Sequence, residues 1–154
     1  MNIENIKPFI EASQTVLKKI ADIDVKIGKV YLKDSPYRSG SVLVFVGLTG
    51  EMLGQTIFTM EINVALSIAS CMMNAELSEL DEMSISAICE LTNMIIGNAA
   101  TILYKKGMRV AITPPSFVMG DNMQVSPNKA KTICIPLLFS NGGGMEIDIS
   151  LLEL

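Results

Sequence analysis

A row of chemically useful residues lies near the middle of the chain: Ser86, Glu90, Asn93 and Gly97. Their separations of four, three and four residues align them along one face of an α-helix. Glu90 offers a negative charge, and Asn93 beside it offers a hydrogen-bond donor and an acceptor, enough to hold one water in a fixed orientation. Gly97 has no side chain, so another backbone can approach there. We call these four residues the polar row, a candidate docking surface with one useful polar tip.

The same spacing also occurs on ordinary solvated helix faces. Glu82 extends the row upstream and Tyr104 lies roughly on it downstream, as polar surface positions would. A glutamate followed three residues later by an asparagine is common by chance. Spacing alone therefore leaves both interpretations open.

The helix that must carry the polar row is predicted from about Ser78, as N-cap, to Lys105 and Lys106. Asp81 stands three residues after Ser78, and Gly107 supplies a left-handed stop. Seven residues share a broad face that we expect to turn toward the core: Ile85, Ile88, Thr92, Ile95, Ile96, Ala99 and Leu103.

Periodicity and turn residues predict the remaining elements. We expect a first helix capped by Asn5 with Pro8 in its first turn, strands over 25–32, 41–48 and 52–60, a helix over 63–73, and strands over 132–139 and 145–151. Apolar and polar residues alternate along 145–151, which predicts a half-buried strand. The fold class is then α+β: one domain over 1–154, with a mainly antiparallel sheet and helices packed on one side.

Composition excludes several classes of function. Hydrophobic residues make up 49% of the chain, which is typical of a globular protein. The net charge is -4, so the chain is poorly suited to bind the phosphate backbone of a nucleic acid. The N-terminus lacks the pattern of a signal peptide, and the apolar stretches 42–48 and 94–103 are too short or too interrupted to span a bilayer. We therefore expect a cytoplasmic protein without membrane insertion.

Histidine is absent, which excludes Ser-His and Cys-His nucleophiles and most catalytic zinc sites. The three cysteines, Cys71, Cys89 and Cys134, each stand among apolar residues and are predicted to be buried, reduced thiols rather than zinc ligands. Residues 142–144 form a glycine run that lacks the Lys-Ser/Thr of a phosphate loop, so a hairpin turn is expected. No metal site of the chain's own is predicted.

The whole chain resembles the CheX branch of the CheC/CheX/FliY chemotaxis phosphatases. The resemblance runs through 5–12 and 47–54 and is sharpest over 86–98, Ser86-x-x-x-Glu90-Leu-Thr-Asn93-Met-Ile-Ile-Gly97-Asn. The family signature is an Asp or Ser, a Glu four residues later, an Asn three after that, and a proline some twenty-odd residues downstream. Pro114 or Pro115 fits that proline.

This resemblance implies dephosphorylation of a phosphorylated CheY-like response regulator, whose receiver domain supplies the phospho-aspartate and its Mg²⁺. Glu90 would pair with a receiver lysine, and Asn93 would orient the attacking water. The chain would need no cofactor of its own. The chain carries one complete motif, since 11–14 has Gln in place of Asn, and this supports the CheX type, which forms homodimers. The alternating strand 145–151 could pair across such a dimer through its edge.

Two other functions remain open. A non-enzymatic adaptor could bind a response regulator, or dock to a motor complex, through the same helix face. A small-molecule sensor could line a pocket with some of the eleven methionines, although core packing is their commoner use.

Overall fold

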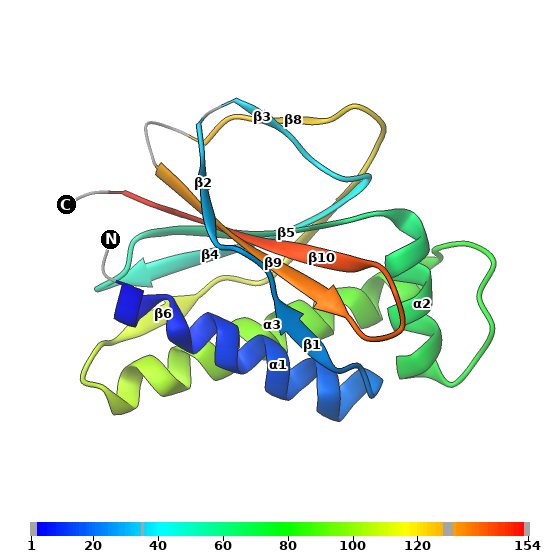
Figure 1. Cartoon of the computed structure of the whole chain (residues 1–154), viewed down its shortest axis with the longest axis horizontal. Helices are drawn as coiled ribbons and strands as arrows, with labels where there is room; N and C mark the ends of the chain where they lie inside the picture. The colour runs from blue at the N-terminus through cyan, green and yellow to red at the C-terminus, as the bar shows by residue number, and fades with distance from the viewer. Residues whose placement is uncertain (1–2, 35, 128–130, 153–154) are drawn as a thin grey trace.

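The computed structural model describes residues 3–34, 36–127 and 131–152, and shows a curled antiparallel sheet over three helices (Figure 1). The helices are α1 (Lys7–Ala21), α2 (Ile62–Met73) and α3 (Glu82–Lys105), with a short 3-10 helix η1 (Ile3–Asn5) before them. The strands are β1 (Val25–Ile27), β2 (Tyr31–Lys33), β3 (Tyr37–Arg38), β4 (Val42–Gly50), β5 (Gly54–Met60), β6 (Val110–Ile112), β7 (Ser116–Met119), β8 (Gln124–Val125), β9 (Lys131–Phe139) and β10 (Gly144–Leu151).

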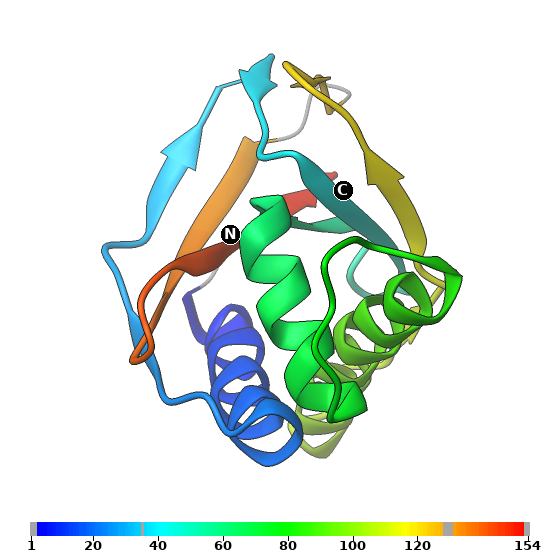
Figure 2. The ribbon, with the colours of Figure 1, turned by 90° about the vertical axis from the view of Figure 1, so that its right-hand side faces the viewer.

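The main sheet has eight strands in the order β1-β9-β10-β5-β4-β6, with β2 also on β9 and β7 also on β4. Strands β3 and β8 form a separate two-stranded sheet, which we call the outer flap. Figure 2 shows the three helices side by side under one face of the main sheet, with the outer flap on the far side. The predicted α+β class, with helices on one side of an antiparallel sheet, is confirmed.

The core has two unequal parts on the two faces of the sheet. Val42 and Val44 of β4 join the large cluster beneath the helices, whereas Leu43 joins a small cluster with Ile57 and Val125 beneath the outer flap. Strand β4 is thus buried on both faces over this stretch, as its run of valines predicted.

The C-terminal strand differs from its prediction. Strand β10 lies between β9 and β5, paired to both along its length. Its polar residues Asp148 and Ser150 are buried, because the outer flap covers the face that we expected to meet solvent. The strand is neither half-buried nor an edge, so the predicted pairing of its edge across a dimer is wrong.

The predicted strand over 25–32 is two strands, β1 and β2, both paired to β9. The break lies at Gly28, whose backbone N–H donates to the carbonyl of Pro136 at 3.0 Å. Pro136 has no N–H to return to the ladder, and a side chain at Gly28 would lie 2.9 Å from the Pro136 ring. Pairing therefore lapses opposite the proline.

The hairpin turn between β4 and β5 also lies later than predicted. Thr49 and Gly50 continue β4 because they pair with Ala111 and Val110 of β6, and the turn falls at 51–53. Gly50 has a φ of 93°, and a Cβ there would lie 2.7 Å from the carbonyl oxygen of Arg109, so only glycine fits.

Two helix starts are corrected by the structure. Helix α1 follows Ile6, because η1 takes up Asn5, and its first turn contains Pro8 as predicted. Helix α3 is capped by Asp81 instead of Ser78. The Asp81 carboxylate accepts the Ser84 backbone N–H at 2.8 Å, while the Ser84 hydroxyl accepts the Asp81 N–H at 2.7 Å. This hydrogen bonding lowers the pKa of the Asp81 carboxyl.

The end of α3 is as predicted: Gly107 has a φ of 89°, and its N–H donates to the carbonyl of Tyr104 at 3.0 Å. The 24 residues of α3 are long and apolar enough to cross a membrane by those two measures alone. A core helix satisfies the same measures, and the buried side of α3 packs against α1, α2 and β6.

Candidate active site

The structure places the polar row along the outward side of α3. Ser86 and Glu90 are exposed, whereas Asn93 and Gly97 are half-buried. The opposite side of the helix is buried: Ser84, Ile88, Leu91, Thr92, Ile95, Ile96, Ala99 and Leu103. This set differs from the predicted face in that Ser84 and Leu91 are buried and Ile85 is only half-buried. The buried side of the helix is therefore slightly rotated about the helix axis from the predicted one.

The side chains of Glu90 and Asn93 are at least partly exposed and are not bound to other described residues. Within the described ranges, neither side chain takes part in a hydrogen bond or an ion pair. The neighbouring Thr92 contrasts with them, because it is buried and its hydroxyl donates to the carbonyl of Cys89 at 2.8 Å. With about 1.5 Å of rise per residue, Glu90 and Asn93 lie about 4.5 Å apart along the axis. A carboxylate and an amide are therefore held side by side and free to bind.

Gly97 has no intramolecular reason to be glycine. Apart from its own helix backbone, a Cβ built at this position meets no atom of the described residues within 4 Å, so the space beside it is open. Glycine within a helix costs about 1 kcal/mol relative to alanine. A residue that weakens the helix and relieves no crowding inside the chain is typical of a surface that another molecule approaches closely.

The packing behind the polar row makes α3 a firm platform. Leu91, Ile95 and Ile96 are fully buried in the large core cluster, in contact with α1, α2 and the sheet. An outward side chain on such a helix keeps its position with little reorganisation. The row is thus placed by a core that extends along most of the helix.

The two candidate prolines lie in the loop between β6 and β7, and both of these strands contact α3. Thr113 anchors this loop to β4, because its hydroxyl accepts the Gly47 N–H at 2.8 Å and its N–H donates to the Gly47 carbonyl at 3.0 Å. Pro114 is exposed and Pro115 half-buried. Pro114 is therefore the more available of the two to a partner.

The prediction of three buried thiols is correct for Cys134 alone, since Cys71 is exposed and Cys89 half-buried. The apolar neighbours of Cys71 belong to a helix, whose periodicity turns this residue away from the core. Burial raises the pKa of the Cys89 thiol, which keeps it protonated beside Glu90. Cys89 therefore supplies no thiolate nucleophile next to the polar row.

Sequence reasoning missed a charged cluster on the outer face of the sheet. Lys33 of β2 lies 2.5 Å from the Glu146 carboxylate and 3.3 Å from the Asp148 carboxylate. Cys134 stands opposite Asp148 across the β9–β10 ladder. Burial and the charge of Glu146 raise the pKa of Asp148 to about 6. The only available signal is the pair of carboxylates on β10, and their alternation with apolar residues is equally typical of a strand with one face in solvent.

The chain is similar to chemotaxis proteins in both sequence and fold. The family model described as chemotaxis phosphatase CheX matches residues 42–138. The CheY-P phosphatase CheX of Thermotoga maritima is 31% identical over 126 residues, 81% of each chain. A CheX crystal structure from Desulfovibrio desulfuricans is 30% identical with a TM-score of 0.87, covering 97% of this chain and 99% of that one. A CheX-CheY-BeF3-Mg²⁺ complex from Borrelia burgdorferi matches with 33% identity and a TM-score of 0.84, over 99% and 100% of the two chains. This chain therefore belongs to the CheX family of chemotaxis phosphatases, and it is a phosphatase.

Proposed function

We propose that this protein hydrolyses the aspartyl phosphate of a CheY-like response regulator, with the polar row of α3 as its catalytic surface. The observation that carries the proposal is the pair Glu90 and Asn93, held side by side on a firmly packed helix with no partner among the described residues. The Borrelia relative forms a complex with CheY, BeF3 and Mg²⁺. Because beryllofluoride has the shape of a bound phosphoryl group, that complex supports a phosphorylated receiver as the substrate here.

Asn93 is the proposed catalytic residue. Its amide carbonyl would accept a hydrogen bond from the attacking water, and its NH₂ group would donate to an oxygen of the phosphoryl group. Phosphoryl transfer needs little covalent assistance, so orienting one water can be enough. An oriented water is worth on the order of a hundredfold in rate, about 3 kcal/mol. The water oxygen attacks phosphorus, and the bond between phosphorus and the aspartate oxygen breaks. The products are the free carboxylate and inorganic phosphate.

Glu90 is the proposed anchor. Its exposed carboxylate would pair with a lysine of the receiver and hold α3 against the receiver's active site. Ser86 and Gly97 would lie in the same contact, Gly97 where the two backbones come nearest. The Mg²⁺ would be held by the receiver, where it neutralises charge on the phosphoryl oxygens.

We further propose that residues 1–154 act as one domain, and that the protein works in the cytoplasm as a homodimer. Sedimentation equilibrium of the purified protein tests the oligomeric state. A monomeric mass at all accessible concentrations would contradict the proposed homodimer.

The deciding experiment follows the decay of a ³²P-labelled, aspartyl-phosphorylated CheY-like receiver in Mg²⁺, alone and with substoichiometric protein. We expect accelerated decay with multiple turnovers, in which every molecule of this protein releases several phosphates. Binding of the phosphorylated receiver with an unchanged phosphate lifetime would refute the enzymatic role and favour the adaptor. Release of no more than one phosphate per molecule of this protein would refute catalytic turnover.

A further inference from the structure

The charged cluster on the outer face of the sheet contains reactive side chains that have no part in the function proposed for the polar row. It combines Cys134 of β9 with Glu146 and Asp148 of β10, whose ligand atoms all lie within 4.8 Å of one another. Neighbouring residues Ile135 and Ile147 point the other way, into the core beneath the helices. The cluster is therefore separated from α3 by the thickness of the sheet.

The cluster has too little positive charge for its depth. Asp148 is fully buried and Glu146 is only 17% exposed, yet the described residues bring them a single ammonium, that of Lys33. One positive charge opposes two negative charges, which is costly in an apolar site. Asp148 is also incompletely paired: its Oδ2 faces Lys33, whereas its buried Oδ1 has no hydrogen-bond partner in the described parts of the chain. The buried hydroxyl of Tyr37, which interacts with the same carboxylate, likewise makes no hydrogen bond there.

A divalent cation would remove both defects. Bound to the Cys134 thiolate, Glu146 and Asp148, it adds two positive charges while the thiol loses one proton. Together with Lys33 the cluster then sums to zero: three positive charges and three negative ones. The free Oδ1 of Asp148 would become a ligand, and Lys33 could keep its hydrogen bond to Oδ2.

The donor set identifies the class of metal. One thiolate sulfur and two carboxylate oxygens suit Zn²⁺ and its spectroscopic substitute Co²⁺, whereas Mg²⁺ and Ca²⁺ avoid sulfur. Tetrahedral zinc places such ligand atoms about 3.5 Å apart. The ligand atoms here lie within 4.8 Å of one another, so each pair must close by at most about 1.3 Å, which small side-chain rotations would supply.

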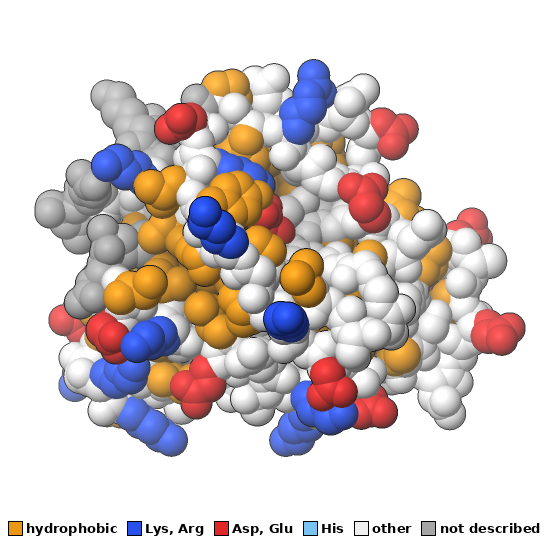
Figure 3. All heavy atoms as spheres, in the orientation of Figure 1, with side chains coloured by type: hydrophobic (Ala, Val, Ile, Leu, Met, Phe, Trp, Pro, Cys, Tyr) orange, Lys and Arg blue, Asp and Glu red, His pale blue; other side chains and the backbone are white. Residues whose placement is uncertain are grey.

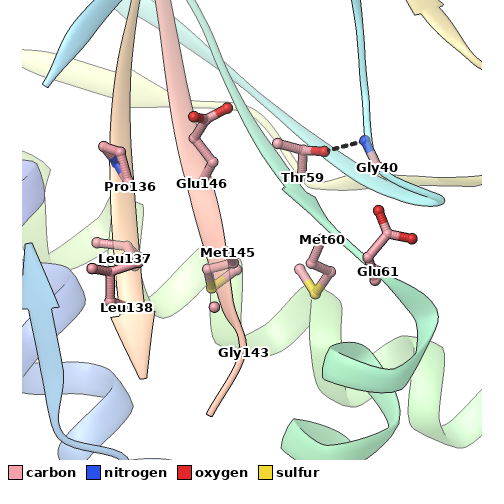
Figure 4. A pocket seen from close by; sticks show the side chains of 11 residues that line it. Gly40, Thr59, Met60, Glu61, Pro136, Leu137, Leu138, Gly143, Met145 and Glu146 are labelled. Atoms are coloured by element: carbon pink, nitrogen blue, oxygen red, sulfur yellow. Dashed lines mark hydrogen bonds between the residues drawn. The ribbon is translucent and has the colours of Figure 1, made fainter. Parts of the chain in front are cut away.

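The surroundings resemble those of established metal sites in two respects. Tyr31 and Lys33 both donate hydrogen bonds to Glu146, and such donors orient ligating carboxylates. Glu146 also lines a hollow of about 330 Å³ beside Thr59 and Gly40, so this one ligand borders a space open to solvent (Figure 4). Figure 3 shows hydrophobic side chains gathered on one face of the molecule, and Tyr31 and Leu32 of β2 are among the exposed hydrophobic residues.

From this geometry we infer that Cys134, Glu146 and Asp148 form a binding site for one Zn²⁺ ion, with water as the fourth ligand. The ion would bind the native fold on the face opposite α3. It would then stabilise the link between β2, β9 and β10, and it takes no part in the hydrolysis proposed for the polar row.

The test is a Co²⁺ titration of the full chain, stripped of metal with a chelator and kept reduced by a phosphine. We expect a thiolate-to-cobalt charge-transfer band that saturates at one Co²⁺ per chain and that Zn²⁺ abolishes by competition. The double variant Cys71→Ser/Cys89→Ser is the matched control and should keep the band. Cys134→Ser should lose it. Absence of the band from the native chain, its survival in Cys134→Ser, or its loss from the double variant overturns the proposal.

A second variant decides the case if Cys134→Ser fails to fold. Glu146→Gln keeps the shape of a half-buried side chain and removes one ligand charge. We expect its Zn²⁺ affinity to fall at least tenfold, with a correspondingly smaller rise in Tm on adding Zn²⁺. Unchanged affinity in this variant would overturn the proposed ligand set. Both readouts are independent of phosphatase activity, so they stand whether or not the polar row is catalytic.

Discussion

The substitution Asn93→Ala separates catalysis from folding more cleanly than any other change in this chain. The amide has no hydrogen bond to any described residue, so its removal leaves no buried partner unsatisfied. Alanine is also the better helix former, by about 0.5 kcal/mol. We therefore expect the free energy of unfolding to change by less than about 1 kcal/mol.

The expected loss of activity is much larger. If Asn93 orients the attacking water, its removal raises the barrier by about 3 kcal/mol, which lowers kcat on the order of a hundredfold. The receiver should still bind, because Glu90 and the rest of the polar row are intact. Asn93→Gln should also be slow, since one extra methylene displaces the amide and a misplacement of about 1 Å can cost about a hundredfold.

The assay is phosphoryl-receiver decay over a range of receiver concentrations, which resolves kcat from KM. Asn98→Ala is the matched control, because Asn98 is an exposed asparagine on the same helix that points away from the polar row. It should retain full activity. Normal turnover by a folded Asn93→Ala protein, or equal losses in both variants, would refute the reasoning.

Three further predictions follow from the same helix. Glu90→Gln should raise KM about tenfold, change kcat less than about threefold, and weaken the salt dependence of KM; a pure kcat effect would contradict the anchoring role. Gly97→Ala should raise the free energy of unfolding by about 1 kcal/mol in urea titrations and also raise KM, whereas Gly107→Ala should lower stability because of its φ of 89°. Ser84→Ala should cost about 1 kcal/mol by removing half of the capping box, while Ser78→Ala should have no effect; the reverse order would mean that the cap is misassigned.

Features set by residues close in sequence could be predicted. The polar row of α3 follows from a 3.6-residue period alone, and the stop at Gly107 from the conformation that glycine allows. The predicted start of α3 is wrong because Ser78 and Asp81 are both good N-cap residues. Each has a suitable polar residue three positions later, Asp81 after Ser78 and Ser84 after Asp81, so the sequence fits a capping box at either position.

Features set by residues distant in sequence could not be predicted. The break between β1 and β2 depends on Pro136, more than a hundred residues away from Gly28. The burial of Asp148 depends on the outer flap, which short strands from two separate parts of the chain assemble. Cys134 looked inert in sequence because its charged neighbours come from other strands.

The position of β10 has a consequence for how the protein is made. This strand is synthesised after every other strand of the sheet, yet it lies in the middle, between β9 and β5. Until residues 144–151 leave the ribosome, β5 and β9 each present an open edge, and the apolar side of α1 and α3 has an incomplete sheet to pack on. Pairings of such high contact order slow folding and expose strand edges to aggregation. We therefore expect nascent chains stalled before residue 144 to bind chaperones and resist compaction.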